Sequence, residues 1–178
     1  MDDDLLDRLQ LGDPAAFDDL VVQYHRAVYD FAYRLTHDRA TAEDVAQDVF
    51  VRAYRGLGGF RRASSLKTWL FRIAIRVASD ARPEVSARTT LAPPLTVEPD
   101  ALAALEQSER EAELARAMAR LSGKQRATLV LRVAHDLPFR EIAEVMGAPL
   151  GTVKATYHQA VSRLRELVGN PRPVPKVH

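Results

Sequence analysis

Apolar residues recur at helical spacing along most of this chain, and near its beginning they predict two helices separated by a break. The acidic N-terminus is followed by a brief apolar face that ends at Gly12-Asp13-Pro14. A continuous apolar stripe then runs from Phe17 to Leu35. The sequence His37-Asp38-Arg39 ends this second helix in a turn.

The third predicted helix has one buried and one exposed side. Thr41 with Asp44 three residues later matches a capping box, which predicts a helix start there and an end near Leu57. The buried side consists of Val45, Val49, Phe50 and Ala53. The exposed side consists of Asp44, Gln47, Asp48, Arg52 and Arg55. Its acidic residues favour a solvated or protein-docking surface over a metal site.

A glycine-rich break leads to a fourth predicted helix. Gly56, Gly58 and Gly59 end the third helix, and a basic loop follows over Phe60–Ser65. The core face of the fourth helix consists of Leu66, Trp69, Leu70, Ile73, Ala74 and Val77, and Pro83 stops the helix. Basic residues with aromatic residues nearby suit nucleic-acid binding, whereas for Trp69 core packing is the favoured interpretation.

The second half of the chain begins with a linker. Residues 84–101 contain three prolines and lack a helical period. The helical pattern resumes near Leu102 and runs to about Leu121. Ser122 with Gln125 forms another capping box and predicts a helix through about Val133.

The stretch from Leu137 to Leu167 has the pattern of a helix-turn-helix. Pro138 suits the first position of a helix, Gly147 suits its left-handed end, and Pro149 restarts the chain. The second helix has an apolar stripe made of Val153, Tyr157, Ala160, Leu164 and Leu167. Its outward residues are Thr152, Lys154, Ala155, Thr156, His158, Gln159 and Arg163. Such a face suits the major groove of DNA, although a plain helical hairpin has the same pattern.

These patterns together predict an all-α fold with two small helical domains joined by a flexible linker. The N-terminal helical bundle spans residues 1–83, and the acidic, proline-rich linker spans 84–108. A C-terminal four-helix domain containing the helix-turn-helix spans 109–169, and residues 170–178 are expected to be a disordered tail.

The distribution of charge along the chain suggests two nucleic-acid surfaces. The net charge is only +1, but residues 1–50, 51–82, 83–113 and 114–178 carry −8, +7, −5 and +7. Two basic segments that alternate with acidic ones indicate two separately placed faces for nucleic acid.

Several classes of function are excluded by what the sequence lacks. There is no cysteine, and the five histidines do not have metal-ligand spacing. No nucleophile elbow or phosphate loop occurs, so we expect no enzyme activity, no metal and no cofactor. No apolar run is long enough to span a membrane and the N-terminus is acidic, so we expect a cytoplasmic protein without membrane insertion.

Three segments resemble one family. AEDVAQDVFVRAYRGLGGF (42–60), SSLKTWLFRIAIRVASDAR (64–82) and LSGKQRATLVLRVAHDLPFREIAEVMGAPLGTVKATYHQAVSRLREL (121–167) resemble a bacterial RNA polymerase sigma factor. The closest type is the extracytoplasmic-function (ECF) class of the sigma-70 family. The resemblance covers nearly the whole chain up to about Leu167, with both domain signatures in order.

The resemblance implies partners and a role for each surface. Core RNA polymerase would be bound through its β′ clamp helices by Asp44, Gln47 and Asp48. The promoter −10 element would be captured and melted by Phe60, Arg61, Arg62, Ser64, Ser65, Lys67, Arg72 and Arg76. The −35 element would be read by Thr152, Lys154, Ala155, Thr156, His158, Gln159 and Arg163, in a domain that also contacts the β flap. The acidic linker would occupy the RNA path, and an anti-sigma factor is a further expected partner.

The chain departs from the family pattern in places that concern DNA. Arg76 stands where the family often has Asn, which changes the expected base preference of the −10 surface. The recognition-helix segment GTVKATYHQAV (151–161) has Thr156, Gln159 and Val161 in place of arginines and Tyr157 in place of a core leucine. Fewer cations predict weaker non-specific attraction to DNA.

A free-standing helix-turn-helix regulator is the alternative function. The helix-turn-helix by itself fits both functions. The basic segment with the Thr68-Trp69-Leu70 helix favours the sigma factor, because a simple regulator needs no second nucleic-acid surface.

Overall fold

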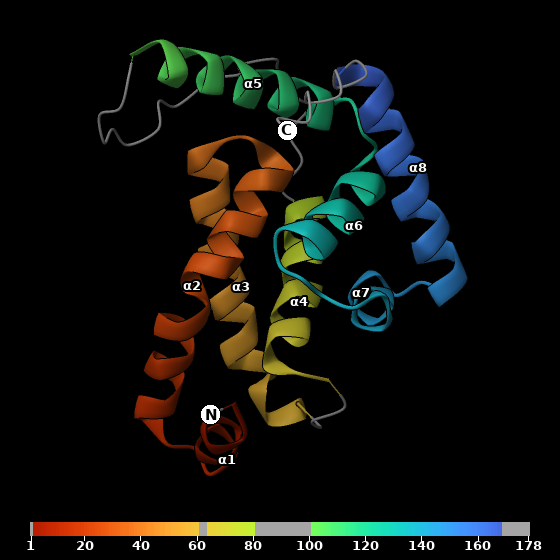
Figure 1. The fold of residues 1–178 in the computed structure, drawn as a ribbon. Helices are drawn as coiled ribbons and strands as arrows, with labels where there is room; N and C mark the ends of the chain where they lie inside the picture. Colours follow the sequence, from red (N-terminus) through yellow and green to blue (C-terminus); the bar gives the residue numbers. More distant parts are fainter. Residues whose placement is uncertain (1, 61–63, 81–100, 169–178) are drawn as a thin grey trace, which may run out of the picture.

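The computed structural model describes residues 2–60, 64–80 and 101–168, and all regular structure among these residues is helical (Figure 1). The N-terminal unit contains α1 (Asp2–Gln10), α2 (Pro14–Thr36), α3 (Arg39–Gly56), the 3₁₀ turn η1 (Leu57–Gly59) and α4 (Leu66–Asp80). The C-terminal unit contains α5 (Ala101–Ala119), α6 (Gly123–Val133), α7 (Phe139–Met146) and α8 (Leu150–Val168). The all-α prediction is confirmed.

The core of the N-terminal unit lies between α2, α3 and α4. Its largest fully buried side chains include Leu20, Phe31, Val49, Leu70 and Phe71. The predicted buried side of α3 is confirmed, because Val45, Val49, Phe50 and Ala53 are all buried. Burial of these apolar groups is the main source of stability for such a bundle.

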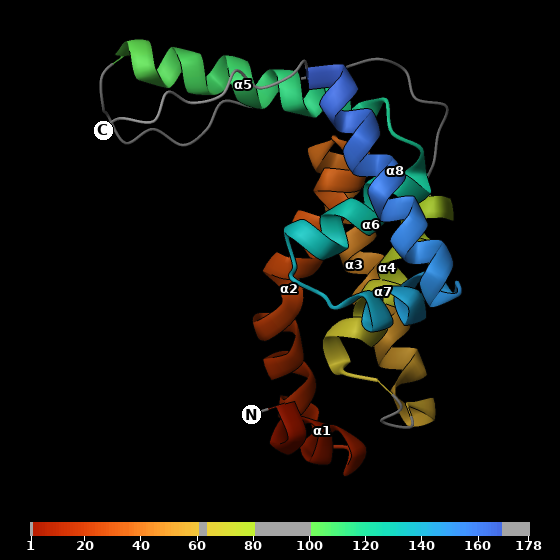
Figure 2. The ribbon, with the colours of Figure 1, turned by 45° about the vertical axis from the view of Figure 1, so that its right-hand side comes forward.

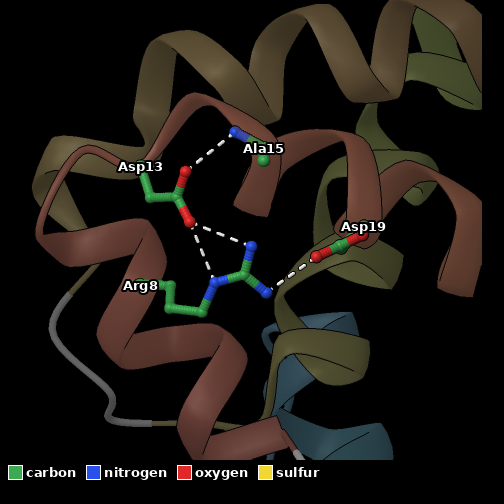
Figure 3. A network of polar contacts seen from close by, with 4 residues as sticks. All are labelled: Arg8, Asp13, Ala15 and Asp19. Carbon is green, nitrogen blue, oxygen red and sulfur yellow. Dashed lines mark hydrogen bonds and ion pairs between the residues drawn. The ribbon is translucent and has the colours of Figure 1, made fainter.

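α1 packs across the beginning of α2 and is held there by a polar network (Figure 3). Nε of Arg8 donates to Asp13 at 2.9 Å, and its Nη1 donates to Asp19 at 2.7 Å. The other carboxylate oxygen of Asp13 accepts from the backbone N–H of Ala15 and thereby caps α2. The hydrogen bond from Arg8 is the largest cause of the lowered pKa of Asp13.

The start of α3 differs from the prediction. Asp38 is the N-cap, and one of its carboxylate oxygens accepts from both the backbone N–H and the hydroxyl of Thr41, at 2.8 and 2.6 Å. The capping box of Thr41 with Asp44 is therefore wrong, because both residues already lie within the helix. Asp38 has an extended backbone, which places its carboxylate over the free N–H groups of the first turn.

In the C-terminal unit the helix caps agree better with the predictions from sequence. Ser122 and Gln125 form the predicted capping box of α6, and Gly147 ends α7 with a φ of +58°. Pro138 was predicted as the first helical residue of α7, but it is the N-cap, one position before the helix begins. Pro138 has an extended backbone, with a ψ of 151°, and the helix therefore begins at Phe139.

The two units pack against each other along α2 and α4. α6 contacts α2, and α7 lies beside α4 in both views, while α8 forms the outer edge (Figures 1 and 2). One apolar cluster continues from the N-terminal core to Leu131, Ile142 and Val153. The side chain of Arg126 on α6 donates to the backbone oxygen of Leu35 at the end of α2 at 2.6 Å.

Only some of the predicted domain boundaries lie within the described residues. α5 begins at Ala101, in agreement with the helical pattern that was predicted to resume near Leu102, and the end of the predicted linker at residue 108 stays a prediction. Residues 84–100 of the predicted linker and the predicted tail, 170–178, lie outside the described residues.

Candidate nucleic-acid interface

The outer face of α8 is the most exposed of the predicted surfaces. Val153 and Ala160 are buried and anchor the helix, and Leu164 is half-buried. Thr152, Lys154, Ala155, His158, Gln159 and Arg163 are exposed, and Thr156 is half-buried. We call these seven residues the recognition face. The structure thus places every residue predicted for −35 contact on one helix, around the part of its circumference that lies away from the buried Val153 and Ala160.

Tyr157 separates the recognition face from the core of the C-terminal unit. Its ring is half-buried and packs edge-on against Phe139 of α7, with the ring centroids 5.3 Å apart. This contact confirms the inward direction predicted from its place in the apolar stripe. Arg163 forms an ion pair with Glu166 at 2.9 Å on the exposed side of α8.

The second predicted DNA surface, on α4, is in contact with the C-terminal unit. Nζ of Lys67 donates to the backbone oxygen of His135 at 2.8 Å. The guanidinium of Arg72 lies 3.9 Å from the carboxylate of Glu144 on α7. Arg76 lies further along α4 and is exposed. Two of the three described cations predicted for −10 contact therefore face α7 and the turn before it.

The residues that precede α4 have structural partners of their own. Ser65 caps the helix, because its hydroxyl accepts from the backbone N–H of Thr68 at 3.1 Å. Phe60 is buried and packs against Trp69, with 4.9 Å between the ring centroids. Ser64 is half-buried. Arg61 and Arg62 lie outside the described residues.

The core face of α4 is rotated relative to the prediction. Trp69 and Ile73 are only half-buried, whereas Thr68 and Phe71 are buried. Phe71 packs against Phe31 of α2 and against His135, with centroid distances of 5.0 and 4.7 Å. The C-terminal unit covers a second side of α4. The prediction from apolar periodicity had placed that side at the surface, because it considered only the packing of α4 in its own bundle.

The third predicted surface is the acidic side of α3. Asp44 and Gln47 are exposed, and Asp48 is half-buried. Asp48 forms an ion pair with Arg52 at 2.9 Å, and Arg52 also reaches Asp80 of α4 at 3.4 Å. The hydrogen bond that Arg52 donates to Asp48 is the largest cause of the raised pKa of Arg52.

An apolar notch lies beside this acidic side and was missed by sequence reasoning. It has a volume of about 480 Å³ and is lined by Phe17, Phe50, Val51, Tyr54 and Arg55. Tyr54 is 66% exposed and Val51 is 46% exposed. Both are large apolar residues outside the buried stripe of α3. Their position in the sequence could therefore have identified them as part of an exposed apolar surface.

The described part of the chain contains no cluster of histidine, aspartate or glutamate that could hold a metal ion. None of the described helices has the length and hydropathy of a membrane span.

Comparison with known families identifies both units. The family model for Sigma-70 region 2 matches residues 20–84, and the family model for Sigma-70 region 4 matches residues 111–164. The first match contains α4, and the second contains the recognition face. A helical chain with both regions in this order is a sigma factor, the class of protein that directs RNA polymerase to promoters.

Individual relatives make the assignment more specific. RNA polymerase sigma-H factor of Pseudomonas aeruginosa is 37% identical over 172 residues, covering 89% of each chain. ECF RNA polymerase sigma-E factor of Escherichia coli is 32% identical, covering 93% of this chain and 91% of that protein. SigW of Bacillus subtilis, another ECF sigma factor, is 30% identical, covering 89% of this chain and 92% of its own length. The chain belongs to the ECF class of the sigma-70 family.

Solved structures agree on the fold. CnrH, solved with the cytosolic domain of CnrY, has a TM-score of 0.72 and 24% identity, covering 94% of this chain and 96% of that chain. RpoE of Bartonella quintana, solved with the anti-sigma factor NepR, has a TM-score of 0.65 and 25% identity, covering 88% and 98%. The two family matches and the sigma-factor relatives set the free-standing regulator aside. The relatives are sigma factors, which are not enzymes.

Proposed function

We propose that this sigma factor binds core RNA polymerase through the acidic side of α3, reads the −35 element with the recognition face, and melts the −10 element with α4 and the loop before it. The observation that carries the proposal is the recognition face. Six of its seven residues are exposed, and the helix that presents them is anchored by the buried residues Val153 and Ala160. Such a helix can enter a major groove without disturbing the core of its own unit.

The finer partners are part of the same proposal. The β′ clamp helices would dock on Asp44, Gln47 and Asp48, and the β flap would contact the C-terminal unit. An anti-sigma factor would regulate the protein, as NepR is a partner of RpoE in the solved complex. The site of action would be the cytoplasm, where polymerase and promoter DNA are found.

Transcription with purified core polymerase tests this proposal. The chain should produce transcripts from a subset of a random promoter library, whereas core polymerase alone should not. Asp44→Arg combined with Asp48→Arg should reduce co-purification with core polymerase and leave the helical fold intact. Asp44 is exposed, and Asp48 is half-buried in an ion pair at the surface, a kind of contact that contributes little to stability.

A matched control separates docking from net charge. Asp18→Arg combined with Glu113→Arg makes the same change in charge at exposed positions on α2 and α5. This control variant should bind core polymerase like the wild type. Equal binding by both double variants would reject the docking assignment, and a chain that supports no transcription would reject the function.

A further inference from the structure

We propose that α1 positions the segment that opens the −10 element, by fixing the 3₁₀ turn η1 from which that segment begins. This inference rests on the proposed function, because it takes the chain between η1 and α4 as the melting segment. It assigns a task in promoter opening to a helix that precedes both family matches and contains none of the predicted site residues.

The turn η1 has few contacts of its own to hold it in place. It consists of Leu57, Gly58 and Gly59, and a side-chain carbon added at either glycine would meet no atom within 4 Å. Glycine also loses more conformational freedom on folding than any other residue. Leu57 is half-buried against the N-terminal core and is the one side chain that anchors the turn. The position of η1 therefore depends on the elements around it.

α1 is one of these elements. It contacts both α2 and η1 at the bottom of the bundle in Figure 1. The inner side of α1 consists of Leu5, Leu6 and Leu9, which are 5, 6 and 4% exposed and belong to the same apolar cluster as Phe60. Burial of these leucines stabilises the contact but sets no direction, because the hydrophobic effect is non-directional. Apolar packing by itself would allow α1 several angles.

The direction of α1 is set by a polar network (Figure 3). Arg8 contacts Asp13 through Nε and Nη2, both at 2.9 Å, and donates through Nη1 to Asp19 at 2.7 Å. Asp13 also caps α2 by accepting from the backbone N–H of Ala15, so the guanidinium ties α1 to the beginning of α2 at two points. A planar guanidinium fixes the geometry of its partners. Because only residues 11–13 connect the two helices, losing this network frees α1 to turn relative to η1.

Arg8→Met tests the assignment, because it removes the network and leaves the three leucines in place. Ion pairs at the surface contribute little to stability, so the variant should unfold at nearly the wild-type temperature. The holoenzyme is given a promoter selected from the random library, with 2-aminopurine in the −10 element to report unpairing. The variant should open this promoter about fivefold more slowly than the wild type, at the lower end of the usual range for coupled sites.

A template already unpaired across the −10 element supplies the readout that a purely structural role would not move. The step assigned to the melting segment is complete on this template, so Arg8→Met should transcribe it at the wild-type rate. Leu57→Ala removes the anchor on the side of η1 and should give the same slow opening, restored by the same template. Arg8→Lys keeps the charge without the planar fork and should lie between Arg8→Met and the wild type.

Arg34→Met is the matched control. It also removes an arginine that is paired with an aspartate, but its partner Asp30, at 2.8 Å, lies on the same helix α2. This variant should open the promoter at the wild-type rate.

A spin label reports on η1 directly. The chain has no cysteine, so the label can be attached through Gly58→Cys, at an exposed position. The label should become more mobile when Gly58→Cys is combined with Arg8→Met, and should stay unchanged when it is combined with Arg34→Met.

Wild-type label mobility in the Arg8→Met chain would overturn the proposal, and so would a wild-type rate of opening. Slow transcription that persists on the unpaired template would also overturn it, because the loss would then lie in polymerase binding or in the fold. Transcription by the wild-type chain, measured in parallel, tests the proposed function by itself. Failure of that function can therefore be told from failure of the role of α1.

Discussion

At the scale of single residues, His135 combines burial with a nearby charge in an unusual way. Its side chain is 6% exposed and lies between two phenylalanine rings, and the carboxylate of Asp30 is 3.8 Å from its Nε2. Burial lowers the pKa of His135 to about 4, and the attraction of Asp30 offsets this only in part. The residue is therefore neutral in the closed chain at neutral pH.

Stability should consequently fall at acidic pH. The histidine pKa is about 6.5 in the unfolded chain, so the unfolded state binds the proton first. The contribution is complete above about pH 6.5 and is lost as the pH falls toward 4. From pH 7 to pH 5 the free energy of unfolding should fall by about 2 kcal/mol from this residue alone.

Urea unfolding at the two pH values measures this, with His135→Phe as the comparison that keeps an aromatic ring and removes the titration. A wild-type pH dependence equal to that of His135→Phe would contradict the assignment.

Trp69 gives a second prediction at this scale. A fully buried tryptophan would cost about 3–5 kcal/mol on truncation to alanine. Trp69 is half-buried against Phe60, so Trp69→Ala should cost roughly 2 kcal/mol of unfolding free energy. Phe71→Ala, at a site 1% exposed, should cost the full amount. An unchanged unfolding free energy for Trp69→Ala would leave the ring available for stacking on a base.

At the scale of elements, the two helices of the helix-turn-helix face different surroundings: α7 contacts α4, and α8 faces solvent. Gly147, in the left-handed conformation, ends α7 and turns the chain toward α8. α7 presents Glu141 and Glu144 toward α4, while α8 presents its cations and amides to solvent. Substitutions on the recognition face should therefore change DNA binding without loosening the contact between the units.

Two residues of α8 are expected to differ in how they contact DNA. Glutamine can bind adenine with two hydrogen bonds, whereas lysine binds phosphate as a point charge. Gln159→Ala should therefore relax the preference at one base position, at a cost of about 1–3 kcal/mol for the preferred base. Lys154→Ala should weaken all promoters alike and reduce the salt dependence of binding.

A template library randomised across the −35 element decides between the two assignments. A base preference altered by Lys154→Ala and unaffected by Gln159→Ala would reverse them.

At the scale of the whole molecule, Arg126 is one of the polar groups that join the two units. Its guanidinium donates to backbone oxygens of Leu35 at the end of α2 and of Met118, Ala119 and Leu121 around the end of α5. The last carbonyl groups of a helix lack partners within the helix, so one cation can satisfy several of them.

Arg126→Met should therefore lower the stability of the closed chain by about 2–3 kcal/mol, since hydrogen bonds to charged groups contribute more than neutral ones. Calorimetry should show the single unfolding transition broaden or divide into two as the units uncouple. Arg120→Met, at an exposed position after α5, serves as the control and should leave the transition unchanged. Equal transitions for both variants would mean that Arg126 does not couple the units.

Local information in the sequence determined the helices and the family. Apolar periodicity placed the buried side of α3 correctly, and Ser122 with Gln125 marked the start of α6. These features depend on residues within a few positions of one another. The predicted start of α3 was wrong because Asp38 and Thr41 were both possible N-caps, and only the backbone geometry selects between them.

The packing of the two units was decided by tertiary structure alone. Lys67 and His135 are 68 positions apart, and Thr68 and Glu141 are 73 positions apart. A periodic pattern identifies one buried side of a helix, the side that faces its own bundle. It does not register a second side covered by a distant segment, especially when the contact is made by charged and hydroxyl groups. For this reason the sequence predicted α4 as an open DNA surface, and the folded chain covers it with α7.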